Sequence, residues 1–199
     1  MYLVIDTETT GLPNYKLPKN NLKQPRIVQI AAILFDDEGK THGKLSTVIK
    51  PDGWVIPDEV AKLHGIDQAR AIREGIPMAI AFSHFRNLVA QADKIIAHNI
   101  AFDKFLVEVE AVKLGFREPT WNGKKLFCTM KESVDITKIP PTEAMKAKRM
   151  FCFKAPNLTE LHTHFFGEGF DGAHDALVDV EACIRCYLEI MKLRAPKAA

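Results

Sequence analysis

The first eleven residues constrain the fold of this chain more than any other stretch. Residues 2–5 form a short apolar run rich in strand formers, which predicts a buried central strand. Asp6 and Glu8 follow at a spacing of two, and on a strand that spacing places both carboxylates on one face. Two such carboxylates repel each other and are costly to desolvate, so a divalent cation between them would relieve the cost. A solvated acidic turn is the alternative, because Asp-x-Glu by itself is a common sequence.

The composition is that of an ordinary globular chain. It has 199 residues, of which 47% are hydrophobic and 26% are charged, and this length favours one domain with a full core. We expect that domain to span residues 1–194, with a frayed tail at 195–199. The net charge of +2 does not by itself indicate a nucleic-acid partner. Two basic loops, residues 14–26 and 138–154, are compatible with a polyanionic ligand and equally with solvated surface loops.

The four cysteines favour a reducing compartment. Cys183 and Cys186 form a C-x-x-C inside a helical pattern with no second pair, so buried reduced thiols are expected rather than a zinc or redox site. We see no signal peptide and no membrane-spanning run, because the N-terminal apolar stretch reaches Asp6 at once. These observations predict a cytoplasmic protein with no membrane partner.

The order of the predicted elements indicates an α/β fold. Strands are expected over residues 2–5, 27–35, 44–49, 94–97 and 125–128, and the first three read as an antiparallel meander. Helices are expected from Pro57 to about His64, from Pro77, over about 100–114, from Asn157 to Gly167, and over about 175–192. Residues 130–155 have no readable pattern. Strands followed by strand–helix alternation predict a mixed sheet with helices on its faces.

Two further acidic blocks match the first in character. Asp103 lies one turn into a helix that follows a predicted strand, and Asp179 lies one turn into the last helix, with His174 just before that helix. An aspartate on the buried side of a helix is unusual unless it has a partner. If the blocks meet Asp6 and Glu8, the four carboxylates can carry two divalent ions roughly 3.5–4 Å apart, the geometry of in-line phosphoryl displacement.

These blocks resemble the three motifs of the DnaQ-like (DEDDh) family of 3′→5′ exonucleases. Asp6-Thr7-Glu8 is similar to the first motif, residues 98–103 to the second, and His174 with Asp179 to the third in its histidine version. The resemblance extends over about residues 1–188. It implies a ribonuclease H-like fold, a mixed five-stranded sheet with helices on both faces.

The resemblance also implies the catalytic parts. Asp6 would bridge two Mg²⁺ ions, for which Mn²⁺ would substitute. Glu8 and Asp179 would complete the shell of one ion, and Asp103 would bind the other. His174 would act as general base, because an imidazole takes up protons near neutral pH. The implied product is a nucleoside 5′-monophosphate released from the 3′ end of a nucleic acid.

Weaker expectations concern the side chains around the terminal nucleotide. For Ile66 and Phe102, plain core packing is an equal alternative to contact with the terminal base. His162 and His164 are expected on the surface, and Asp175 as a helix cap. The substrate-contacting residues that the resemblance implies are Thr7, Thr9, His64, Ile66, Asn99 and Phe102.

The motifs do not choose the nucleic acid. Single-stranded DNA is the favoured substrate, and a DNA polymerase subunit is a candidate partner. An RNA-trimming exoribonuclease, similar to oligoribonuclease or ribonuclease T, shares the same motifs. A non-catalytic nucleic-acid-binding accessory protein is the alternative from another class, and the intact acidic set argues against it.

Overall fold

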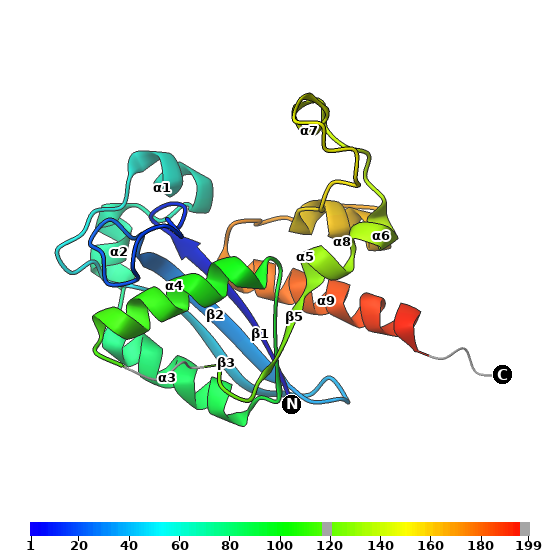
Figure 1. Ribbon diagram of the computed structural model, residues 1–199. Helices are drawn as coiled ribbons and strands as arrows, with labels where there is room; N and C mark the ends of the chain where they lie inside the picture. The colour runs from blue at the N-terminus through cyan, green and yellow to red at the C-terminus, as the bar shows by residue number, and fades with distance from the viewer. Residues whose placement is uncertain (117–120, 196–199) are drawn as a thin grey trace.

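The computed structural model describes residues 1–116 and 121–195 and is built on a five-stranded mixed sheet (Figure 1). Strands β1 to β3 form the antiparallel meander predicted from the sequence, and β4 and β5 continue the sheet in parallel with β1. The sheet order is β3-β2-β1-β4-β5, which places β1 at its centre. The strands are β1 (Tyr2–Thr9), β2 (Ile27–Phe35), β3 (Thr41–Val48), β4 (Lys94–Ala97) and β5 (Lys125–Cys128).

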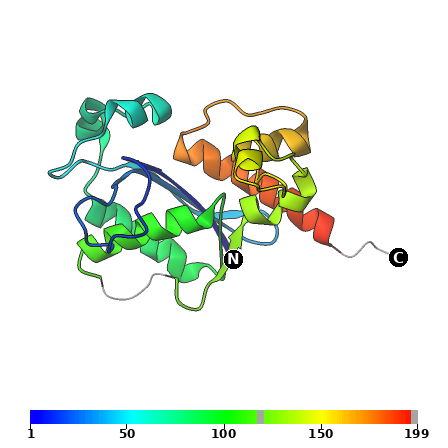
Figure 2. The ribbon, with the colours of Figure 1, turned by 45° about the horizontal axis from the view of Figure 1, so that its top comes forward.

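Helices cover both faces of the sheet, as the sequence predicts (Figures 1 and 2). Leu3 and Ile5 of β1 pack with α3 and α4, while Val4 between them packs with α9. This alternation follows from the twofold side-chain period of a strand. The helices are α1 (Asp58–His64), α2 (Gln68–Glu74), α3 (Met78–Gln91), α4 (Ile100–Lys113), α5 (Thr129–Glu132), α6 (Val134–Thr137), α7 (Glu143–Ala147), α8 (Leu158–Phe166) and α9 (Ala176–Arg194).

Strand β1 is longer than predicted and leaves one edge open. It continues through the acidic residues because β2 pairs with it as far as Thr9, but its pairing with β4 ends at Val4. The last part of β1 therefore has no strand beside it on the β4 side. The N-terminal ends of α4 and α9 come to this part of the strand, which creates room for a site there (Figure 1).

Helix α2 and the short helices α5 to α7 are elements that the sequence patterns did not predict. Helix α2 begins after Asp67, whose side chain accepts a hydrogen bond from Arg70 N, an N-cap signal that the sequence contains. The predicted caps of the last two helices are confirmed. Asn157 and Glu160 form a capping box for α8, and Asp175 accepts hydrogen bonds from the first turn of α9.

One prediction about an individual side chain is wrong. His162 is 1% exposed rather than on the surface, because its ring packs against Phe166 and Phe170. Cys183 and Cys186 are buried as expected; Cys128 is buried as well, and Cys152 is exposed. Ala195 ends α9, and the rest of the predicted frayed tail, 196–199, lies outside the described residues. Within the described ranges, no helix is both long and apolar enough to cross a membrane.

Candidate active site

A cavity of about 510 Å³ lies at the C-terminal end of β1. It is bounded by the strand itself, by the beginnings of α4 and α9, and by α1 on the opposite side. All five predicted catalytic residues line it. The lining residues are Asp6, Thr7, Glu8, Thr9, Gly11, Leu12, Val60, Leu63, His64, His98, Asn99, Phe102, Asp103, Met130, Asn157, Leu158, His174 and Asp179.

Strand β1 contributes Asp6 and Glu8, which share the strand face that Val4 presents to α9. Glu8 is 9% exposed, and its backbone pairs with Gln29 of β2. The same-face arrangement expected from the spacing of two is therefore present in the structure. Because both carboxylates lie on a paired strand, the sheet fixes their positions.

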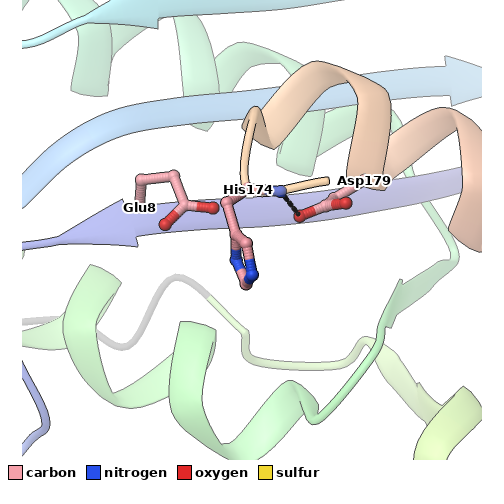
Figure 3. A group of neighbouring side chains, drawn as sticks. All are labelled: Glu8, His174 and Asp179. Atoms are coloured by element: carbon pink, nitrogen blue, oxygen red, sulfur yellow. Dashed lines mark hydrogen bonds between the residues drawn. The ribbon is translucent and has the colours of Figure 1, made fainter. Parts of the chain in front are cut away.

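Helix α9 and the loop before it contribute Asp179 and His174. The backbone N–H of His174 donates a 3.1 Å hydrogen bond to Asp179 Oδ2 (Figure 3). His174 has a left-handed backbone with φ of 70°, a conformation that non-glycine residues adopt mainly at special sites. Ligand atoms of Glu8, His174 and Asp179 lie within 4.8 Å of one another, and the His174 side chain itself is exposed.

Helix α4 contributes Asp103, which comes from the opposite face of the sheet. The helix begins after Asn99, which also has a left-handed backbone with φ of 72°, and Asp103 lies in its first turn. Asp103 is buried, and its Oδ1 accepts a 2.9 Å hydrogen bond from the Thr7 hydroxyl. The Thr7 hydroxyl is therefore already hydrogen-bonded to an acidic side chain of the cavity, a contact that the sequence did not indicate.

The electrostatics of the cavity disfavour four free carboxylates. Burial and the neighbouring Asp103 raise the pKa of Asp6 well above its usual range. Burial, with the Asp179 charge adding to it, raises the pKa of Glu8 to about 8. Burial raises the pKa of Asp103 to about 7 and that of Asp179 to about 6. In each case the charged form lacks enough positive partners.

This donor set fits hard divalent cations. Four carboxylates with raised pKa values face one cavity, and among the described residues the cluster of Glu8, His174 and Asp179 is close enough for single atoms to share one ion. Oxygen ligands are those that Mg²⁺ and Mn²⁺ prefer, and a bound cation would offset the desolvation and mutual repulsion of the carboxylates.

Most of the predicted substrate contacts line the cavity. Thr9 uses its hydroxyl to bond the Gly11 carbonyl, at 2.9 Å. Asn99 and Phe102 lie on the α4 side. His64 is 7% exposed, and its Nδ1 accepts a hydrogen bond from Ile66 N, while its Nε2 has no hydrogen-bond partner in the described part of the chain.

Ile66 is not among the lining residues, so the core-packing alternative holds for it rather than the contact with the terminal base. It is 1% exposed and packs with Val28 and Ile56 beneath α1. The physical reason is Gly65, whose φ of 72° ends α1 and turns the following residue inward. Leu63, which the sequence reasoning passed over, is 55% exposed and lines the cavity instead. The glycine signal that closes the helix could have revealed this exchange.

His98 is a further residue that sequence reasoning left without a role. Its Nε2 donates to the Pro156 carbonyl and its Nδ1 bonds the Thr129 hydroxyl, each at 3.0 Å. Burial lowers the pKa of His98 to about 4, so the ring is neutral. His98 thereby joins the end of β4 to α5 and to the segment before α8.

The fold is shared with solved structures. This protein resembles E. coli exonuclease I in complex with a dT13 oligonucleotide, with a TM-score of 0.73, 20% identity, and coverage of 96% of this chain and 40% of that chain. The protein also resembles exonuclease X in complex with 5′ overhanging duplex DNA, with a TM-score of 0.59, 22% identity, and coverage of 100% of this chain and 95% of that chain. These likenesses concern the fold, which is the ribonuclease H-like fold of DEDD exonucleases.

The family follows from sequence. The family model RNase_T, described as exonuclease, matches residues 3–187. The chain therefore belongs to this exonuclease family, whose members are 3′→5′ exonuclease hydrolases and are typically metal-dependent.

Three relatives illustrate its range. The 3′-5′ exonuclease DinG of Bacillus subtilis is 32% identical over 97% of this chain, which spans only 18% of that protein. The DNA polymerase III subunit epsilon of Buchnera aphidicola is 29% identical over 94% of this chain and 70% of that protein. A ribonuclease T of Haemophilus influenzae is 26% identical, and the match covers 94% of this chain and 78% of that protein.

Proposed function

We propose that this protein removes nucleotides one at a time from the 3′ end of single-stranded DNA and releases nucleoside 5′-monophosphates. The observation that carries the proposal is the meeting of Asp6, Glu8, Asp103 and Asp179, with His174, around one cavity. They come from a strand and two helices on opposite faces of the sheet. Simple packing does not require four carboxylates to gather at such a position.

The four carboxylates are proposed to hold two Mg²⁺ ions, for which Mn²⁺ substitutes. When bound, such ions lower the pKa of a coordinated water and stabilise the charge that develops on the leaving 3′ oxygen. Asp6, whose pKa is raised by its burial and by the charges of the other three carboxylates, is proposed as the shared ligand. Glu8 and Asp179 would hold one ion, and Asp103, which is held by Thr7, would hold the other.

His174 is proposed as the general base that takes the proton from the attacking water. Its backbone is tied to Asp179, while its side chain is exposed at the cavity and makes no hydrogen bond to another described residue. A base must reach the proton that it removes, and an exposed ring on a loop can adjust when substrate binds.

The terminal nucleotide is proposed to lie between α1 and α4. Phe102 offers an aromatic ring to the last base, and Leu63 offers an exposed apolar side chain from the other side. His64 Nε2, which is buried and has no hydrogen-bond partner among the described residues, is proposed to bond the sugar or phosphate. Thr7, Thr9 and Asn99 contribute backbone contacts or shape the cavity floor. None of these contacts distinguishes one base from another, which suits an enzyme that trims any sequence.

The preference for DNA is supported by the relatives. The epsilon relative is a subunit of a DNA polymerase by name, and the exonuclease I and exonuclease X structures contain DNA. The epsilon relative also supports a DNA polymerase subunit as a candidate partner. An RNA-trimming function is the second candidate, favoured by the ribonuclease T relatives, of which this chain covers 78%.

The test is cleavage of matched single-stranded DNA and RNA oligomers, each labelled at the 5′ or the 3′ end, with Mg²⁺ or Mn²⁺. We expect a ladder that shortens from the 3′ end on DNA, lost with EDTA and with Asp179→Ala. The matched control is Asp171→Ala, an exposed aspartate of the same loop that is outside the cavity lining. Faster cleavage of the RNA oligomer than of the DNA oligomer would show that RNA is the preferred substrate. Equal inactivity of both variants and wild type on every substrate would favour the accessory-protein alternative.

A further inference from the structure

Residues 139–155 form a projecting arm that has no core of its own. An antiparallel bridge between Ile139 and Lys154 closes its base, and α7 lies near its tip (Figure 1). None of these seventeen positions is buried. The arm extends beyond α6 and α8, away from the sheet, and in the second view α7 lies in front of α8 (Figures 1 and 2). A segment that buries nothing does not stabilise the fold by packing, so its side chains are available to a ligand.

The arm ends next to the active-site cavity, and the bridge between Ile139 and Lys154 holds its beginning beside its end. Pro156, the residue after the arm, accepts the hydrogen bond from His98, and His98 lines the cavity. Asn157 and Leu158, the next two residues, line it as well. Phe151 is five residues from Pro156, so it can lie no more than roughly 18 Å from that anchor. A strand whose 3′ end occupies the cavity has the arm within reach of its upstream nucleotides.

The charge of the arm is positive and partly uncompensated. It contains four cationic side chains and Glu143 as its acidic one. Lys146 pairs with Glu143 at 2.8 Å, and Lys154 pairs with Glu160. Lys148 and Arg149 form no salt bridge with any residue that the structure describes. Arg149 has a left-handed backbone with φ of 58°, a position usually taken by glycine or asparagine, so a bulky cation stands there at a conformational cost.

Large apolar side chains lie beside these cations. Phe151 is 74% exposed, Met150 47% and Phe153 41%. Exposed apolar side chains that gather in one segment mark a binding surface rather than ordinary surface scatter. Aromatic rings interleaved with cations are the combination that single-stranded nucleic acids need, since bases stack on the rings and phosphates pair with the cations.

We propose that the projecting arm is a second nucleic-acid contact, which holds the single strand upstream of the 3′ end by stacking on Phe151 and Phe153 and by ion pairs from Lys148 and Arg149. The inference rests on the proposed exonuclease function and adds to it a substrate preference. Paired bases cannot stack on the rings, so the arm favours single strands over duplexes. It also favours strands long enough to reach from the cavity to the arm.

The kinetic test compares a dinucleotide with an oligomer of about 12 nucleotides, a length within the site size of single-strand binders. The variants are Phe151→Ala/Phe153→Ala and Lys148→Gln/Arg149→Gln. We expect both to cleave the dinucleotide at wild-type kcat/KM and to raise KM for the oligomer at least about fivefold. The charge variant should also reduce the salt slope of oligomer binding by about 1.4, from about 0.7 for each lost phosphate contact. Lys40→Gln/Lys192→Gln removes the same charge from other parts of the surface and should change neither value.

A second readout needs no variant and no catalysis. Cys152 lies between the two phenylalanines and is exposed, whereas Cys128, Cys183 and Cys186 are buried. With Ca²⁺ in place of Mg²⁺, the long oligomer should slow alkylation of Cys152 by a maleimide severalfold, and the dinucleotide should not.

The outcomes separate the two proposals. Failure of the wild-type protein to cleave either substrate would overturn the proposed exonuclease function. Cleavage of both substrates, with unchanged KM in the arm variants and no protection of Cys152, would overturn the arm contact and leave the exonuclease intact. In that case the exposed apolar residues would point to a protein partner instead.

Discussion

The Thr7 hydroxyl donates a 2.9 Å hydrogen bond to Asp103 Oδ1 and so joins the central strand to helix α4. Thr7 lies between Asp6 and Glu8 in sequence, but the alternation of the strand points its side chain to the opposite face. Three consecutive residues of β1 therefore serve the site from both faces of the sheet. The outer two supply carboxylates directly, and the middle one orients the carboxylate that α4 supplies.

Thr7→Val should lower activity without unfolding the protein. Valine keeps the shape of threonine but cannot donate to Asp103, so that carboxylate loses its orientation. Loss of such a supporting contact typically costs 10–100-fold in metal affinity or activity. The measurement is kcat as a function of Mn²⁺ concentration. Thr7→Ser, which retains the hydroxyl, should keep most of the activity, and equal activity of the valine and serine variants would contradict this role.

The metal-free protein should lose stability as the pH rises from about 5 to about 8.5. The folded-state pKa values of Asp179, Asp103 and Glu8 are raised to about 6, 7 and 8. The folded state therefore binds more protons than the unfolded state between about pH 4 and 8, so unfolding becomes easier as those protons are lost. We expect the thermal midpoint in EDTA to fall across this range. Mg²⁺ should restore it most strongly at the alkaline end.

Glu8→Gln provides the check on that pH effect. Glutamine has no proton to lose, so the variant should be more stable than wild type in EDTA at about pH 8.5, by an amount on the order of 3 kcal/mol. The difference should nearly vanish at about pH 5, where wild-type Glu8 is protonated in the folded state. Unfolding in urea at the two pH values measures both differences. If the variant were no more stable than wild type at pH 8.5, the ionised Glu8 carboxylate would not destabilise the metal-free protein.

Breaking the ion pair between Arg26 and Glu110 should destabilise the fold strongly. Glu110 is buried and accepts two hydrogen bonds from the Arg26 guanidinium, at 2.8 and 2.9 Å, and a third from Ile27 N. Arg26 also pairs by its backbone with Thr10, at the end of β1. Glu110→Ala leaves a largely buried guanidinium without a partner, at a cost of about 3–5 kcal/mol.

Urea unfolding measures the effect of Glu110→Ala, and Glu74→Ala is its matched control. Glu74 pairs with Arg70 and Arg73 on the exposed surface of α2, where such pairs contribute at most about 1 kcal/mol. Similar losses of unfolding free energy in the two variants would mean that the burial of Glu110 does not strengthen its ion pair with Arg26.

His162 should act on catalysis through the loop that carries His174. Its Nδ1 donates a 2.8 Å hydrogen bond to the Glu168 carbonyl, and its ring packs against Phe166 and Phe170. His162→Phe keeps the aromatic packing and removes the hydrogen bond, so residues 168–174 lose an anchor. We expect kcat to fall severalfold with KM nearly unchanged, and amide exchange in the loop to accelerate.

His164→Phe is the control for that loop prediction. His164 is on the same helix but is exposed. Its replacement should leave kcat and amide exchange in the loop unchanged. Unaltered amide exchange of residues 168–174 in His162→Phe would show that His162 does not anchor the loop.

The helices and strands with strong local signals could be predicted from the sequence. β2, β4 and β5 have the predicted bounds, and the capping box at Asn157 and Glu160 begins α8 as expected. Side-chain periodicity and caps act over a few residues, so they can be read locally. Helix α2 was missed because its seven residues carry no strong apolar stripe. Its cap at Asp67 was the available signal.

The α/β architecture, the three acidic blocks and the same-face placement of Asp6 and Glu8 could be predicted from residue order alone. These follow from spacing along a strand or helix. The contacts between the two faces of the sheet came instead from the way the elements pack. This packing paired Thr7 with Asp103, placed Leu63 rather than Ile66 at the cavity, buried His162, and left the projecting arm without a core. These contacts depend on strand order and on how the chain turns after each helix, and spacing within a single segment contains no information about either.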